Sequence, residues 1–249
     1  MLCYTYVMDK PFIGKKALVI GGTGGIGRAV ALGLARRGAE LRIHGASSQE
    51  RLNNTLKAIE ELEGKGEGFL LSIENPVAAV EILARAPDPD ILVCAWGPFR
   101  RAALEKMDVD FWQSMVMCNL AFPGLAISLV IPGMIKKKWG RILLFGGTNT
   151  DTIRGFLSST AYSAAKTGLG VIAKSVAKSA AGSGVSCNVI CPGLTDTEYL
   201  GEDEKRYNRD LSPQGYALSP EEIAGVCMDI LENPRINGAI IPVDNGICL

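Results

Sequence analysis

The chain has 249 residues, 47% of them hydrophobic, and its 26 basic and 26 acidic residues give a formal net charge of zero. This length suffices for one well-buried α/β domain and is short for two. The balanced charge gives no electrostatic reason to expect a nucleic-acid partner. The seven cysteines lack a paired metal spacing and there is a single histidine, so we expect no metal site and reduced core thiols in a cytoplasmic protein.

Neither end of the sequence nor its apolar stretches indicate a membrane protein. Residues 1–10 lack a basic start and an apolar core, so they are interpreted as an optional N-terminal extension and not as a signal peptide. The longest apolar stretch, 121–135, is shorter than a bilayer span and contains two prolines. No membrane partner is therefore expected.

Strands and helices are predicted in alternation along the chain. An apolar run at 17–20 predicts a buried strand, and a glycine-rich turn at 21–27 leads into a helix that continues to Arg37. Further strands are predicted at 40–45, 67–72, 90–94, 141–145, 185–190 and 239–243. Further helices are predicted at 49–62, 76–84, 111–135, 161–181 and 220–232, the last opened by a Ser-Pro-Glu-Glu cap.

This order predicts the fold class. Strands that alternate with helices favour a single Rossmann-type doubly wound parallel sheet, here of about seven strands with helices on both faces. Residues 1–249 are thus expected to form one domain. The polar stretch 197–219 is predicted to be irregular, with a solvated helix face at 202–206.

The glycine-rich turn between the first strand and the first helix predicts a phosphate site. A helix N-terminus offers unpaired N–H groups and a positive dipole end, and residues without Cβ let a pyrophosphate approach. The alternative is a bare structural turn. The residues expected at the site are Gly21, Thr23, Gly24, Gly25, Ile26 and Gly27.

The end of the second predicted strand bears on which dinucleotide binds. An acid there binds the ribose 2′-hydroxyl and repels a 2′-phosphate, and this chain has none. Ser47 and Ser48 can donate to a 2′-phosphate, with Arg51 close behind, although capping the next helix explains the serines equally well. NADP(H) is favoured, and NAD(H) remains open. His44, on the strand, is expected to be packed and not a catalytic base.

Tyr162 and Lys166 are four residues apart on a predicted helix, so both side chains project from one face. A nearby ammonium favours the ionised phenol and is expected to lower the pKa of the tyrosine. Such a phenol can give a proton to a carbonyl oxygen as hydride reaches the carbon, or take it back in the reverse direction. Alone, the pair is equally compatible with a surface tyrosine beside a solvated lysine.

The glycine turn, Asn119, Tyr162-xxx-Lys166, Pro192-Gly193 and Val243-Asp244 follow one another in the order and spacing of one family. From about residue 15 to 247 the chain resembles the compact short-chain dehydrogenases/reductases. The resemblance implies that Tyr162 is the acid/base and that Lys166 also binds the nicotinamide ribose. It further implies that Asn119 continues a water-linked proton relay.

The same resemblance assigns further cofactor contacts. Pro192, Gly193 and Thr197 are expected along the nicotinamide, and Ala95 in a segment that shapes the adenine side. Each residue also has a structural alternative. Asn119 can form a hydrogen bond with the backbone, Pro192-Gly193 can end a strand, and Thr197 can cap a helix. The resemblance also implies a small-molecule carbonyl or alcohol substrate and assembly as a homotetramer or homodimer.

Two segments depart from the family pattern. Cys94-Ala-Trp-Gly97 replaces Asn-Asn-Ala-Gly, so Trp96 either reshapes the pocket or belongs to the core. Gly147 stands where the family has a serine that hydrogen-bonds the substrate carbonyl. Thr148 is the expected replacement, and Asn149, Ser158 and Ser159 are alternatives.

Residues 197–219 are expected to form the substrate lid, with Tyr199, Tyr207, Leu211 and Tyr216 as candidates to line an apolar pocket. The nearest guide to the substrate is a resemblance to 3-oxoacyl carrier-protein reductases. The basic run 136–138 can meet an acidic carrier protein or simply be a solvated helix end.

Two hypotheses follow. The first is an NADP(H)-dependent carbonyl reductase or alcohol dehydrogenase, which Asn119, Tyr162 and Lys166 favour. The second is a dinucleotide-binding protein with little or no catalysis, which Gly147 and the altered 94–97 segment favour. A hydroxyl or amide of Thr148 or Asn149 within hydrogen-bond reach of the Tyr162 hydroxyl discriminates between them.

Overall fold

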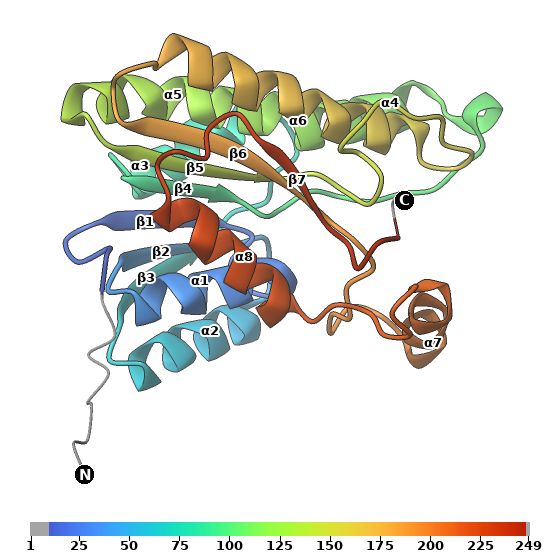
Figure 1. Cartoon of the computed structure of the whole chain (residues 1–249), viewed down its shortest axis with the longest axis horizontal. Coiled ribbons are helices and arrows are strands. Elements are labelled where there is room, and N and C mark those ends of the chain that lie inside the picture. The colour runs from blue at the N-terminus through green and yellow to red at the C-terminus, as the bar shows by residue number, and fades with distance from the viewer. Residues whose placement is uncertain (1–9, 248–249) are drawn as a thin grey trace.

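Seven parallel strands form one sheet in the computed structural model, which describes residues 10–247 (Figure 1). The strands are β1 (Lys16–Ile20), β2 (Glu40–Gly45), β3 (Lys65–Leu70), β4 (Ile91–Cys94), β5 (Gly140–Phe145), β6 (Val185–Pro192) and β7 (Ile240–Val243). Their order across the sheet is β3-β2-β1-β4-β5-β6-β7. The winding reverses between β1 and β4, and open α/β sheets bind ligands at the carboxyl ends of the strands beside such a point. The predicted fold class is confirmed.

Helices cover both faces of the sheet (Figure 1). One face carries α1 (Gly25–Arg36), α2 (Gln49–Glu61) and α8 (Pro220–Glu232), and the other carries α3 (Ala78–Arg85), α5 (Phe122–Lys137) and α6 (Thr160–Ser179). Val19 packs into the first layer and its neighbour Leu18 into the second, because successive strand side chains point to opposite faces. The N-terminal extension expected at 1–10 lies outside the described residues except for Lys10.

One helical stretch runs from Val109 to Lys137, through α4 (Val109–Val116), a π-helical turn (Met117–Ala121) and α5. The Asp108 carboxylate caps its start by accepting a hydrogen bond from the Phe111 N–H at 2.8 Å. Within residues 10–247, this is the one helix long and apolar enough to cross a membrane by length and composition, with 44% of its apolar window buried in the fold. The helix is longer than the apolar run 121–135, which by itself is too short to span a bilayer. Its buried face packs against the sheet, as the core helix of an α/β layer does.

Strand β3 begins and ends two residues earlier than predicted. A Cβ on Gly68 would lie 2.4 Å from Leu52 Cδ1, and one on Gly66 would lie 3.2 Å from Ile59 Cδ1, so the α2 side chains pack directly on the strand backbone. The close packing of this strand against α2 therefore requires glycines, which a search for apolar residues does not detect.

The predicted irregular segment 197–219 contains a helix, α7 (Glu202–Leu211), which stands apart from both helical layers (Figure 1). The Glu204 side chain caps it by accepting a hydrogen bond from the Gly201 N–H at 3.1 Å. Lys205 forms ion pairs with Glu202 at 3.3 Å and Asp196 at 3.8 Å, so the expected solvated face at 202–206 is confirmed. The prediction of an irregular segment was wrong for 207–211, because the helix continues to Leu211 although it has few apolar residues.

Histidine and cysteine behave as core residues. His44 is fully buried, its Nε2 lies 2.8 Å from the Leu71 carbonyl oxygen, and burial lowers its pKa to about 4. The expected packed histidine is confirmed. The described cysteines are buried free thiols, namely Cys94, Cys118, Cys187, Cys191 and Cys227. Cys3 and Cys248 fall outside the part of the chain that the structure describes.

Candidate active site

The glycine-rich turn sits at the switch point, between β1 and α1. Gly21 adopts φ +81°, and its N–H and that of Gly22 donate to the His44 carbonyl at 3.1 and 3.0 Å. A Cβ on Gly27 would lie 2.2 Å from the Gly21 carbonyl oxygen, so α1 can approach the turn only without a side chain there. The first N–H of α1, that of Gly25, points outward and donates to a carboxylate oxygen of Glu198 at 2.9 Å. The turn thus already binds an oxygen anion, as a phosphate site must.

The residues at the end of β2 have mainly packing and capping roles. The Thr23 methyl group lies 2.6 Å from where a Cβ on Gly45 would stand, which places the turn against β2. Ser48 caps α2 by accepting a hydrogen bond from the Arg51 N–H at 3.3 Å, the alternative left open by the sequence. Among the described residues, no side chain bonds to Ser47. The Arg51 guanidinium instead lies 4.6 Å from the centre of the Tyr199 ring.

The segment after β4 has both a site face and a core face. The Ala95 N–H donates to the Ile20 carbonyl at 2.9 Å, and Ala95 and Gly97 line a pocket at the carboxyl ends of the strands. Trp96 packs on the opposite side, edge-on to Phe122 of α5 at 6.3 Å between ring centres. The structure therefore places Trp96 in the core.

Tyr162 and Lys166 lie one turn apart on α6, and both line the same pocket. The buried Lys166 ammonium donates to the Phe145 carbonyl at 2.9 Å and lies 5.6 Å from the centre of the Tyr162 ring. Burial lowers the pKa of Lys166 to about 8. The pKa of the Tyr162 phenol is raised, first by burial and then by the neighbouring Cys191, so the predicted lowering was wrong for this arrangement.

Asn119 reaches the site through the π-helical turn, a feature that often marks functional positions in helices. Its Nδ2 donates to the Pro98 carbonyl at 3.0 Å. Its buried Oδ1 has no hydrogen-bond partner among the described residues. A Cβ on Gly97 would lie 2.2 Å from that oxygen and 3.3 Å from Lys166 Nζ, so Gly97 leaves room beside both polar atoms. Asn119 thus bonds the backbone through its amide N–H, the structural alternative, and leaves an unsatisfied acceptor near the buried ammonium.

Gly147 faces the tyrosine hydroxyl. A Cβ at position 147 would lie 3.0 Å from Tyr162 Oη, so this is where a serine would meet the substrate oxygen. The Thr148 hydroxyl donates to the Pro192 carbonyl at 3.1 Å, and the Asn149 side-chain oxygen accepts a hydrogen bond from Arg154 at 3.0 Å. No hydrogen bond joins the Tyr162 hydroxyl to another described residue. Ser159 and Ser163 instead pair with each other at 3.0 Å at the edge of the pocket.

The Pro192-Gly193 turn after β6 lines one side of the pocket. The Gly193 N–H donates to the Val243 carbonyl at 2.9 Å, and a Cβ on Gly193 would lie 2.5 Å from Asp244 Cα. Thr197 lies against the start of α1, where its Cγ2 is 3.5 Å from the Cβ position of Gly25. The segment predicted along the nicotinamide and the glycine turn are thus neighbours in space.

These elements surround a pocket of about 900 Å³. Eight of the predicted site residues line it, namely Ile26, Ala95, Thr148, Tyr162, Lys166, Pro192, Gly193 and Thr197, and so does Gly147 at the expected serine position. The other predicted residues of the glycine turn (Gly21, Thr23, Gly24, Gly25 and Gly27) and of the end of β2 (Ser47 and Ser48) do not line it, and Asn119 lies behind Gly97. Two contacts at the site had no sequence signal: the Phe99 ring packs edge-on to Tyr162 at 4.8 Å, and Glu198 binds the glycine turn. Both contacts join segments far apart in the chain.

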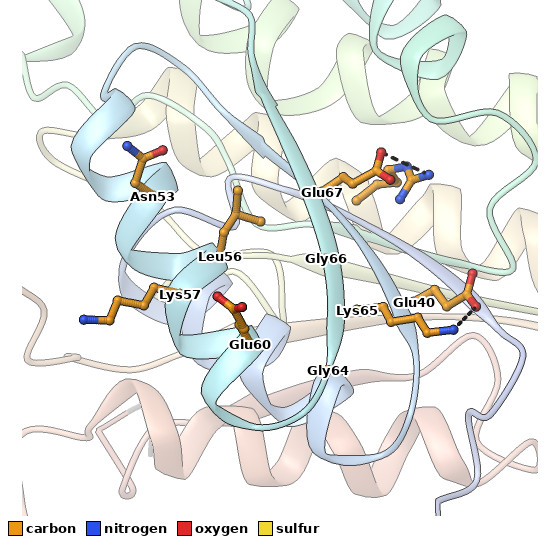
Figure 2. Close-up of a pocket in the computed structure, with 10 residues that line it drawn as sticks. Glu40, Asn53, Leu56, Lys57, Glu60, Gly64, Lys65, Gly66 and Glu67 are labelled. Carbon is orange, nitrogen blue, oxygen red and sulfur yellow. Dashed lines mark ion pairs between the residues drawn. The ribbon is translucent and has the colours of Figure 1, made fainter.

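A second depression, of about 770 Å³, lies between α2 and β3 (Figure 2). Figure 2 shows that most of the side chains around it are charged. Four of them form two ion pairs, Arg42 with Glu67 at 3.3 Å and Lys65 with Glu40 at 3.9 Å. Residues 10–247 contain no cluster of three or more His, Cys, Asp or Glu suited to a metal ion, here or elsewhere. This depression results from glycine-dependent packing of α2.

The fold and the site define a Rossmann-type protein in which a glycine turn and a Tyr-Lys pair share one pocket. Residues 15–208 match the short chain dehydrogenase family, so the chain belongs to the short-chain dehydrogenases/reductases and is an oxidoreductase of that family. The chain is 34% identical to a 3-oxoacyl-[acyl-carrier-protein] reductase of Aquifex aeolicus, over 96% of this chain and 100% of the relative. It is 32% identical to the Escherichia coli enzyme of that name, over 95% and 98%.

Solved structures agree in fold. A 3-oxoacyl (acyl-carrier-protein) reductase of Agrobacterium tumefaciens with NADP bound matches with a TM-score of 0.89 and 26% identity, covering 98% of this chain and 100% of the other. A short-chain dehydrogenase/reductase of Serratia marcescens matches with a TM-score of 0.85 and 27% identity, covering 96% and 100%.

Proposed function

We propose that the chain is an NADP(H)-dependent oxidoreductase that interconverts a carbonyl group and a secondary alcohol, with Tyr162 as the acid/base. The observation that carries the proposal is that Tyr162 and Lys166 line one pocket, while the buried Asn119 oxygen without a partner among the described residues lies behind Gly97, near the Lys166 ammonium. These three polar groups from two helical stretches do not pair off with one another. A purely structural cluster would satisfy its own hydrogen bonds.

The residues present fit a dinucleotide. The outward Gly25 N–H binds an anion, and the Pro192-Gly193 turn and Lys166 line the same pocket. The absence of an acid at the end of β2, with Ser47 and Arg51 nearby, favours NADP(H), in line with structural relatives crystallised with NADP. When bound, NADPH supplies the hydride.

The chain itself handles the proton. Because burial raises its pKa, the Tyr162 phenol keeps its proton at neutral pH and can donate it to a carbonyl oxygen as that group is reduced to an alcohol. Lys166, with a pKa of about 8, stays largely cationic at pH 7 and stabilises the phenolate left behind. Asn119 Oδ1 faces the space beside the ammonium, where it can hold a water molecule by accepting its hydrogen bond, and that water can relay a proton toward Lys166 and Tyr162.

Thr148 is the proposed second donor to the substrate oxygen. It lines the pocket next to Gly147, and it reaches the carbonyl only by giving up its hydrogen bond to Pro192. Residues 197–219 are proposed as the substrate lid, since Leu200, Tyr207 and Leu211 line the pocket. Tyr199 and Tyr216 do not line it. The apolar lining suits a carbonyl compound with an apolar substituent.

A cytoplasmic homotetramer or homodimer completes the proposal. The buried free thiols fit a reducing compartment. Leu129 on α5 and Val171 on α6 are 45% and 69% exposed, as apolar residues of an interface would be in the isolated chain. Lys137 of the basic run bonds the Asp88 carbonyl and the Asp90 carboxylate at 2.8 and 3.0 Å, so that run serves first to end α5.

A second function, dinucleotide binding with little catalysis, is favoured by one observation: Gly147 puts no donor opposite Tyr162. NADPH consumption measured against 3-oxoacyl thioesters, diketones and ketosteroids decides between the two. Turnover with any of them supports the reductase. Tight NADPH binding without turnover across the panel would favour the binding protein.

A further inference from the structure

The segment Thr197–Tyr199, between β6 and the lid helix α7, lies on the phosphate-binding turn. The Gly25 N–H donates to both carboxylate oxygens of Glu198, at 2.9 and 3.2 Å. A Cβ on Gly24 would lie 2.5 Å from Glu198 Oε1 and 2.0 Å from the Tyr199 hydroxyl oxygen, so both side chains touch the turn itself.

This contact uses the Gly25 N–H, a backbone donor that a dinucleotide phosphate would also bind. The first N–H groups of a helix and its positive dipole end bind either a carboxylate or a phosphate, and one N–H cannot serve two anions that repel each other. The Gly25 N–H belongs to the first residue of α1, with Gly24 at the N-cap and no side-chain cap of its own. Glu198 therefore takes the place that the resemblance gives to the pyrophosphate.

We propose that Glu198 is a built-in competitor for the phosphate groups of the cofactor: its carboxylate holds the Gly25 N–H and must leave before a dinucleotide binds. This inference rests on the proposed dinucleotide-binding function. Leu200, which lines the pocket, is only two residues beyond Glu198, so the carboxylate lies next to the edge of the lid. Arg51, stacked on Tyr199, holds the other side of the same segment.

The test is the affinity for NADPH and for NADH in the wild type, in Glu198→Gln and in the control Glu202→Gln. Glutamine keeps the size of the side chain and removes its charge. Glu202 is an exposed acid of α7 that pairs with Lys205 and not with the turn. We expect Glu198→Gln to bind both nucleotides about two- to fivefold more tightly, since both share the pyrophosphate, and the control to match the wild type.

A second readout does not need the cofactor. The Gly25 amide resonance should shift in nucleotide-free Glu198→Gln and stay in place in Glu202→Gln. Unchanged or weaker nucleotide binding by Glu198→Gln would overturn the inference while leaving the proposed function intact. If neither the wild type nor the variant binds a dinucleotide, the proposed function fails, and the inference fails with it.

Discussion

At the scale of single residues, the site is defined as much by a missing side chain as by those present. Tyr162, Lys166 and Asn119 can be recognised from the family pattern; the structure places the first two in one pocket and Asn119 behind Gly97. The same pattern predicts that Gly147 leaves the serine position empty, and the structure adds how close that position is to the Tyr162 hydroxyl. The hydrogen bond that the Thr148 hydroxyl donates to the Pro192 carbonyl depends on where β6 ends.

Gly147→Ser tests whether the missing donor limits the rate. A serine hydroxyl there would meet the oxygen on which Tyr162 acts, and one such donor is worth about 10²–10³ in rate. Because the new Cβ stands only 3.0 Å from Tyr162 Oη, part of the gain is lost in shifting the ring, and we expect kcat to rise by about tenfold. Gly147→Ala adds the same Cβ without the hydroxyl and should give no rise. An equal rise in both variants would contradict the account.

His44 links stability to pH. Its pKa falls from the ordinary 6.5 to about 4 in the fold, so between these values the unfolded chain takes up a proton that the folded chain does not. Stability is therefore lost as the pH falls through this window. The free energy of unfolding should drop by about 2 kcal/mol more between pH 7 and 5 in the wild type than in His44→Gln, measured by urea titration. Parallel pH profiles would refute this assignment.

At the scale of elements, patterns with a local cause were predictable. The α8 bounds 220–232 follow from its capping box: Ser219 Oγ accepts from the Glu222 N–H at 3.2 Å, and the Glu222 carboxylate accepts from the Ser219 N–H at 2.8 Å. The bounds of β3 and the full length of α7 were not predictable from apolar periodicity. Strand β3 contains glycines that pack beneath α2, and α7 is a charged helix without buried residues.

Ser219→Ala should measure the contribution of that cap. Loss of the hydroxyl leaves the Glu222 N–H without its partner and lowers the free energy of unfolding by about 1 kcal/mol, as judged by chemical denaturation. Ser219→Thr, which keeps a hydroxyl, is the matched control and should stay close to the wild type. A loss of the same size in both would mean that packing, and not the cap, is responsible.

At the scale of the whole molecule, one sheet organises everything that the proposal needs. The switch between β1 and β4 places the glycine turn beside Ala95, and the ends of β5 and β6 bring Gly147 and Pro192 to the same edge. Family membership and fold therefore agree with the convergence at the site. Glu198 is the part that only the folded chain reveals, because it contacts a residue 173 positions away.

The central claim is that Tyr162 is the proton donor, and kcat of Tyr162→Phe for a carbonyl substrate tests it most directly. Phenylalanine keeps the ring that packs against Phe99 and removes only the hydroxyl. We predict that kcat falls by about 10²–10⁴ while the NADPH dissociation constant is unchanged. Tyr207→Phe, a lid tyrosine of the same pocket, should retain nearly full activity. Wild-type turnover in Tyr162→Phe would contradict the account.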